Sequence, residues 1–212
     1  MRAAAVAVII LAVAILHFTP SATPYSPHNP GPSGLSKLAQ TCAVSEQADV
    51  IIITPGAEVP ELNITAGIAP IVDPYANAGD PHIIIANARG TPVYAINATP
   101  LMGSGQPLIW TSPASNSNGS WGPFTLALAV RKGDKIIYIY HAALFANAVF
   151  EKNSRLVEEI CKRPISIVST QGDLAHYYHQ LERQAAAWAA PIALATISLY
   201  SLAERRKWPY AP

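Results

Sequence analysis

Two short polar loops contain the residues whose types could support chemistry. The first loop, "SPHNPGPSG", lies near the N-terminus, and the second, "HAALFAN", follows the apolar run "KIIYIY". Serine, asparagine and histidine side chains donate and accept hydrogen bonds, and histidine also exchanges a proton near neutral pH. The candidate ligand-binding residues in and beside the two loops are Ser26, His28, Asn29, Ser36, His141 and Asn147.

A catalytic role would require an activated nucleophile, and no sequence motif supplies one. Cys42 and Cys161 both fall in or at the end of expected helices, not on a sharp turn after a strand. Neither a Gly-x-Ser-x-Gly elbow nor a Gly-rich phosphate loop with lysine occurs. We therefore expect no catalytic residue and no cofactor. A hydrolytic enzyme that uses His141 with Asp73 or Asp173 is the alternative.

Two expected helices and several apolar runs must position these loops. Apolar residues recur at helical spacing in 35–42 and again in 156–160, where Asn153 can cap the helix N-terminus. The expected strands are the apolar runs within 49–54, 82–87, 92–97, 107–112, 124–130, 135–140 and 165–169.

Apolar strands interleaved with helices predict an α/β domain with a largely parallel sheet flanked by helices. The Pro/Gly/Asn-rich middle, 88–120, is compatible with an antiparallel excursion. In an open α/β sheet, ligands bind beyond the carboxyl ends of the strands. Both polar loops would lie at that edge. The alternative is a structural role, in which their Asn and Ser side chains bond their own backbone and Phe145 fills the core.

Hydrophobic segments near both ends of the chain indicate a membrane protein. The 212 residues are 50% hydrophobic and 13% charged, against about 25% charged residues in typical soluble domains. Residues 1–20 contain an uncharged run with only a weak cleavage site, so we expect a signal anchor or a signal peptide. Residues 185–203 form an uncharged run that we expect to be a transmembrane helix, with 204–212 as a cytoplasmic basic tail.

This topology places residues 21–184 on the extracytoplasmic side of the cell membrane. Three Asn-x-Ser/Thr sequons in that interval agree with it, and they predict glycosylation at Asn63, Asn97 and Asn118. Cys42 and Cys161 are the only two cysteines, so they form either a disulfide or a pair of buried free thiols.

The segment after 170 also contains three potential metal ligands. Asp173, His176 and His179 could share one side of a helix, since they are spaced i, i+3 and i+6. The intervening tyrosines favour an amphipathic segment at the membrane surface instead. We therefore expect no metal site.

Four segments occur in order along the chain and are followed by the C-terminal hydrophobic segment: "TPYSPHNPGPSGLSKLAQ", "ADVIIITPG", "IVDP" and "TSPASNSNGSWGPFTLALAVRKGDKIIYIYHAALFANAVFEKNSRLVEEI". With these segments the chain resembles an uncharacterised family of membrane-anchored domains with a class I glutamine-amidotransferase-like fold. The most specific positions are Ser26, Asn29, Gly31, Gly34, Phe145, Asn147 and Asn153.

The resemblance implies a flavodoxin-like sheet and partners within a membrane system, including a MoxR-type AAA ATPase. It brings no established activity. The chain departs from the family pattern at His141, where related members often carry Asp, and in the abbreviated segment from Glu58 to Gly67. The first departure puts shared ligand chemistry in doubt, and the second suggests a trimmed sheet.

Composition also excludes one class of partner. The formal net charge is +1 and no block of Lys and Arg occurs, whereas nucleic-acid binding requires a clustered basic surface. We therefore expect a membrane-anchored, non-catalytic extracytoplasmic domain that binds a small ligand or a partner protein in an envelope complex. A purely structural subunit of a membrane complex is the second alternative.

Overall fold

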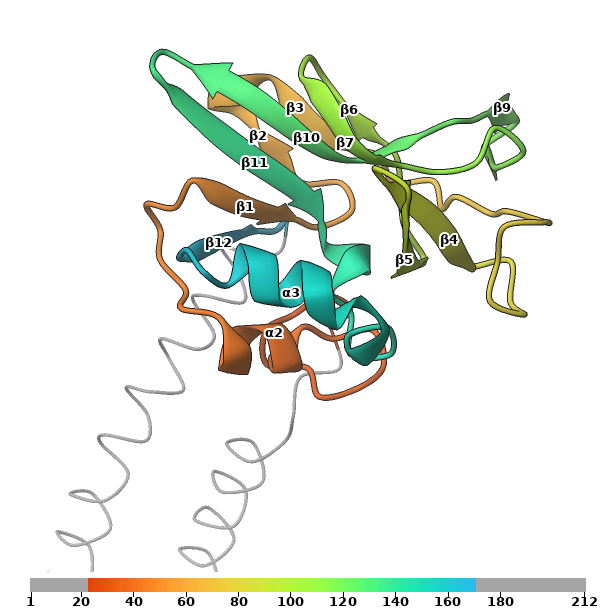
Figure 1. Ribbon diagram of the computed structural model, residues 1–212, viewed down its shortest axis with the longest axis horizontal. Helices are drawn as coiled ribbons and strands as arrows, with labels where there is room; N and C mark the ends of the chain where they lie inside the picture. Colours follow the sequence, from red (N-terminus) through yellow and green to blue (C-terminus); the bar gives the residue numbers. More distant parts are fainter. Residues whose placement is uncertain (1–22, 171–212) are drawn as a thin grey trace, which may run out of the picture. The chain divides into compact units, whose positions relative to one another are not determined.

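The computed structural model describes residues 23–170 (Figure 1). Within this range, no helix combines the length and apolarity that crossing a bilayer requires. The expected signal segment at 1–20, transmembrane helix at 185–203 and basic tail at 204–212 lie outside the described residues.

A seven-stranded mixed sheet forms the centre of the domain. Its strands lie in the order β12-β1-β11-β10-β7-β4-β5. Each strand falls on one of the apolar runs that predict strands, and in β1, β10 and β11 alternate side chains enter two separate cores. The strands are β1 (Val50–Ile53), β4 (Ile83–Ala88), β5 (Thr91–Ile96), β7 (Gln106–Trp110), β10 (Thr125–Lys132), β11 (Lys135–His141) and β12 (Ile165–Val168).

Only three neighbouring strands of this sheet run parallel. β1 pairs in parallel with β11 and β12, whereas β10 is antiparallel to β11 and β7, and β4 is antiparallel to β5 and β7. The prediction of a largely parallel, flavodoxin-like α/β sheet flanked by helices is therefore wrong. Two-residue turns, Arg89-Gly90 and Gly133-Asp134, connect β4 to β5 and β10 to β11. Such turns make hairpins, and a parallel crossover needs a much longer connection.

Strands, not helices, cover one face of the large sheet. A three-stranded sheet of β2 (Glu58–Val59), β3 (Ile64–Ala66) and β6 (Leu101–Met102) buries Ile64 and Leu101 in one cluster with Leu128 and Ile139 of the large sheet. The segment expected to be a trimmed connection thus forms β2, the short turn η1 (Pro60–Leu62) and β3. A continuous apolar run does not distinguish a strand covered by helices from one covered by a second sheet.

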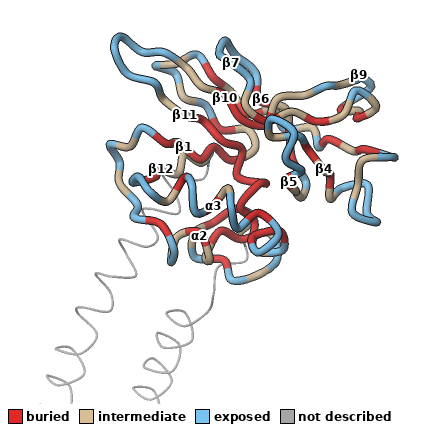
Figure 2. Tube along the Cα trace, in the orientation of Figure 1, coloured by how far each residue is buried: buried red, intermediate tan, exposed pale blue. Residues whose placement is uncertain are grey.

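Two short helices lie on the other face, where Figure 2 shows buried residues gathered between them and the sheet. They are α2 (Ser36–Thr41) and α3 (Ser154–Ile160), and they contribute Leu38, Val157 and Ile160 to the core. The 3-10 turns η2 (Ala142–Leu144) and η3 (Glu151–Asn153) join β11 to α3. A small hairpin of β8 (Asn116–Ser117) and β9 (Ser120–Trp121) extends from the other end of the domain.

Asn153 fastens the edge strand β5 to the helical side of the domain. It precedes α3, but its side chain makes no capping hydrogen bond there, so the capping role that the sequence predicts is wrong. Its Nδ2 donates to the carbonyl oxygens of Tyr94 and Leu144, both at 2.7 Å, and its Oδ1 accepts from the Tyr94 N–H at 2.9 Å. The Tyr25 hydroxyl donates to the Ile96 carbonyl at 2.7 Å. These side chains occupy backbone groups that would otherwise pair with another strand.

Candidate functional site

The two polar loops that the sequence singles out lie against each other. Asn147 Nδ2 donates to the carbonyl oxygens of Asn29 and Gly31 at 3.0 and 2.8 Å, and it lies 3.1 Å from Ser36 Oγ. Asn147 Oδ1 accepts from the Lys37 N–H at 3.1 Å. The side chain of Asn147 therefore joins the loops by bonds within the protein, and its polar atoms are occupied.

The N-terminal loop is also held by bonds to its own backbone. Asn29 is 4% exposed, and its Oδ1 accepts from the Gly31 N–H at 2.7 Å while its Nδ2 donates to the Thr23 carbonyl at 2.9 Å. Ser26 Oγ accepts from the His28 N–H at 3.2 Å. Position 34 requires glycine because a Cβ there would collide with the Asn29 carbonyl. These bonds fold the loop on itself ahead of α2.

His141 is sealed inside the domain at the end of β11. Its side chain is fully buried; Nδ1 accepts from the Ala143 N–H at 3.1 Å, and Nε2 lies 2.9 Å from Thr99 Oγ1. Burial lowers the pKa of His141 to about 3, so the imidazole is neutral at physiological pH. A histidine without access to solvent has no route to abstract a proton from a bound substrate.

Hydrogen bonds within the protein occupy the carboxylate of Asp73, the residue that the hydrolytic alternative pairs with His141. Its carboxylate accepts from the N–H groups of Tyr75 and Ala76 at 2.9 and 2.7 Å and from the Ser112 hydroxyl. Burial opposes ionisation of Asp73, but these hydrogen bonds outweigh it and hold the pKa below its ordinary value. Among residues 23–170, no hydrogen bond connects Asp73 with His141.

The other predicted sites have different outcomes. A disulfide joins Cys42, after α2, to Cys161, after α3, with the two Cα atoms 4.8 Å apart. No group of three His, Cys, Asp or Glu side chains within the described residues could hold a metal ion. Asp173, His176 and His179 lie outside that range.

The asparagines of the three sequons are all exposed and all have left-handed backbone. Asn63, Asn97 and Asn118 have φ angles of 52°, 51° and 49°. The second sequon differs because its threonine, Thr99, is 2% exposed and contacts the imidazole of His141. The first and third sequons are therefore the accessible ones.

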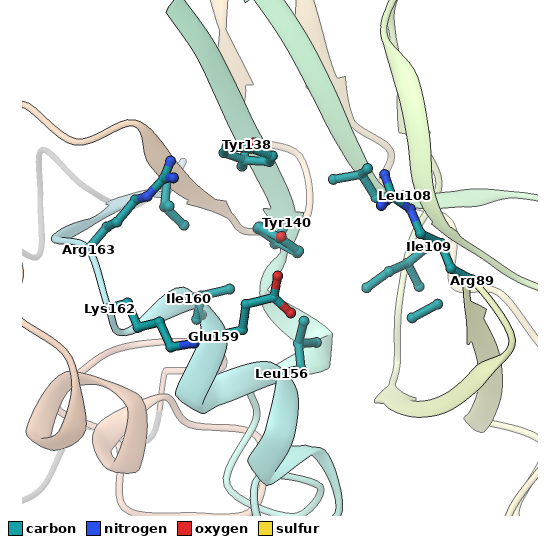
Figure 3. A pocket seen from close by; sticks show the side chains of 12 residues that line it. Arg89, Leu108, Ile109, Tyr138, Tyr140, Leu156, Glu159, Ile160, Lys162 and Arg163 are labelled. Carbon is teal, nitrogen blue, oxygen red and sulfur yellow. The ribbon is translucent and has the colours of Figure 1, made fainter.

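A groove that no sequence pattern singles out lies beside α3 (Figure 3). It has a volume of about 440 Å³, and its lining comes from β11, from α3 with the turn that follows it, and from β7 with the β4–β5 turn. Tyr138 and Tyr140 of β11 pair with Ala129 and Ala127 of β10, so these four side chains share one face of the sheet.

Tyr140 brings a hydrogen-bond donor to this groove. The residue is 8% exposed, and its ring meets Phe145 edge to face at a centroid distance of 5.9 Å. The hydroxyl opens into the groove and makes no hydrogen bond to any residue between 23 and 170. Burial raises the pKa of Tyr140 to about 12, helped by the nearby Glu159 and Tyr138. At neutral pH this hydroxyl is therefore protonated and able to donate.

Charged side chains surround the Tyr140 hydroxyl. Glu159 of α3 points toward it, and the cations of the lining are Arg89, Lys162 and Arg163. In the part of the chain that the structure describes, none of these four forms an ion pair within 4.0 Å. The Arg163 guanidinium instead lies 5.5 Å from the centre of the Tyr138 ring. The groove thus combines three cationic side chains, one carboxylate and a phenol donor.

Sequence patterns could have suggested only part of this groove. The alternation in "IIYIY" puts Tyr138 and Tyr140 on one face, and helical spacing puts Leu156, Glu159 and Ile160 on one side of α3. The position of Arg89 follows from the strand order, which no local pattern encodes.

Comparison of the chain with protein families, curated proteins and solved structures finds no match. The resemblance to the amidotransferase-like membrane family, with its MoxR-type ATPase partner, therefore stays a prediction.

Proposed function

We propose that residues 23–170 form the extracytoplasmic binding domain of a membrane-anchored protein, and that the groove beside α3 takes a small anionic ligand. The Tyr140 hydroxyl carries this proposal because it opens into the groove without a partner among the described residues. A hydroxyl that has no partner within the described residues can donate a hydrogen bond directly to a ligand in the groove. The cations of the lining favour an anionic ligand.

Two further observations support the extracytoplasmic location. The Cys42–Cys161 bond is typical of proteins that fold in an oxidising compartment. Asn63 and Asn118 present exposed sequons, which are glycan acceptors in secreted proteins. The hydrophobic segments predicted at 1–20 and 185–203 would provide the membrane attachment.

Binding fits the geometry better than catalysis does. The histidine on which the hydrolytic alternative depends is fully buried and bonded through both ring nitrogens. The groove residues include one carboxylate, three cations and two phenols but no serine, threonine or cysteine that could act as a nucleophile. The domain would therefore recognise its ligand without transforming it.

Calorimetric titration of the purified full chain with citrate and with inorganic phosphate tests the proposal. We expect binding of at least one anion, and about tenfold weaker binding in Tyr140→Phe, because that variant keeps the ring and loses a hydrogen bond to a charged group. The matched control is Tyr75→Phe, since Tyr75 is 83% exposed and does not line the groove. The absence of binding by both anions, or equal affinity in Tyr140→Phe, would contradict the proposal and favour a structural subunit.

A further inference from the structure

We infer that the ligand of the groove is a short diacid with a hydroxyl or ammonium group between its two anionic ends. This inference rests on the proposed function and adds the chemical class of the ligand. It comes from the positions of the charged side chains around Tyr140, which differ between the walls and the centre of the groove.

Cations stand on opposite walls of the groove. Arg89 enters from the β4–β5 turn on one side, and Lys162 and Arg163 follow α3 on the other (Figure 3). A ligand with one anionic group can engage only one wall. A ligand with an anionic group at each end engages both, and each guanidinium can hold a carboxylate through paired hydrogen bonds.

The centre of the groove, beside Glu159, favours a hydrogen-bond donor over an anionic group. Glu159 points toward the Tyr140 hydroxyl and has no cationic partner among the described residues. An anionic group in direct contact with the Glu159 carboxylate would be repelled. A ligand hydroxyl or ammonium group would donate to Glu159, and a hydroxyl or a carboxylate oxygen beside it would accept from Tyr140. The apolar lining from Leu108 and Leu156 suits the methylene groups that connect such ends.

Calorimetric titration of the full-length protein with three five-carbon ligands tests the second carboxylate and the ammonium group separately. L-Glutamate has two carboxylates and an ammonium group, glutarate lacks the ammonium group, and L-glutamine lacks the second carboxylate. We expect L-glutamate to bind about tenfold more tightly than either of the others, as one good charged hydrogen bond contributes. The preference over glutarate should disappear in Glu159→Gln, and the preference over L-glutamine should disappear in Arg89→Ala.

Matched substitutions on α3 control for nonspecific changes of charge. Glu158→Gln and Arg155→Ala alter exposed neighbours that do not line the groove, so all three affinities should stay within twofold of wild type. Circular dichroism of each variant verifies the fold.

Equal affinity of glutarate or L-glutamine with L-glutamate would overturn the diacid inference and leave the proposed function standing. Binding of phosphate without binding of citrate or of any of the three would do the same. Failure of every anion to bind would overturn both. Glycyl-L-glutamate carries the same diacid at the end of a peptide, so tighter binding of this dipeptide than of free L-glutamate would assign the ligand to an acidic peptide terminus, and weaker binding would assign it to a free molecule.

Discussion

Substitution of Asn153 tests most directly how the edge strand β5 is held in the domain. Its side chain forms three hydrogen bonds, two to the backbone of Tyr94 and one to the buried carbonyl of Leu144. Each bond contributes about 1 kcal/mol net, and an orphaned buried carbonyl adds to the loss. Asn153→Ala should therefore lower the free energy of unfolding by about 3 kcal/mol, which corresponds to a fall of roughly 10 °C in the unfolding midpoint for a domain of this size.

Urea and thermal unfolding of the purified full chain, followed by circular dichroism, measure this loss. Asn87→Ala is the control, because Asn87 is exposed and makes a single hydrogen bond, to the Gly90 N–H. Its expected cost is about 0.5 to 1 kcal/mol.

Asn153→Asp separates the observed role of this side chain from helix capping. Aspartate caps a helix as well as asparagine does, so a capping residue would tolerate the change. The structure instead predicts a loss at least as large as that of Asn153→Ala, because Asp lacks the donors for the Tyr94 and Leu144 carbonyls. Wild-type stability of Asn153→Asp, or a loss below about 1 kcal/mol in Asn153→Ala, would refute the reasoning.

Three further predictions concern the disulfide, the buried histidine and the sequons. The double variant Cys42→Ser with Cys161→Ser should lose about 4 to 5 kcal/mol on the chain-entropy account, because the bond closes a separation of 119 residues; a chemical-denaturation midpoint equal to that of the oxidised chain would contradict this. The pKa of His141 is about 3 when folded and about 6.5 when unfolded, so the unfolded state takes up the proton first. Stability should fall by up to about 1.4 kcal/mol per unit as pH drops below about 6.5, and His141→Gln should flatten this slope in unfolding experiments across pH. Expression in a glycosylating secretory host should add glycans at Asn63 and Asn118 by intact mass, and unmodified protein would argue against the proposed topology.

The strands could be predicted from the sequence, but their arrangement could not. Residues such as Ile51 and Ile52 face different clusters, so a run like "VIII" must be a strand with apolar cover on both faces. The identity of that cover depends on contacts distant in sequence. The two-residue turn at Arg89-Gly90 indicates an antiparallel hairpin. For the arrangement of β4 and β5, this local signal outweighs the apolar pattern that favoured a parallel sheet.

The candidate site, like the fold, could be predicted from the sequence only in part. The sequence places the loops of Asn29 and Asn147 at one edge, and in the structure the Asn147 amide donates to the Asn29 backbone carbonyl, while the Asn29 side chain bonds its own loop. The groove combines Arg89, Tyr140 and Glu159, which lie on three separate elements. Their meeting depends on the order of the strands and on the packing of α3 against the sheet, so only the folded chain reveals it.

Carbon-13 resonances of labelled tyrosine test the central claim most directly, because each ring reports its own surroundings. The chain has nine tyrosines, and the signal that disappears in Tyr140→Phe identifies the groove. On titration of the full chain with citrate, the Tyr140 signal should shift in a saturable way while that of the exposed Tyr75 stays in place. A Tyr140 signal that does not move, or a uniform shift of all the tyrosines, would contradict an anion site in this groove.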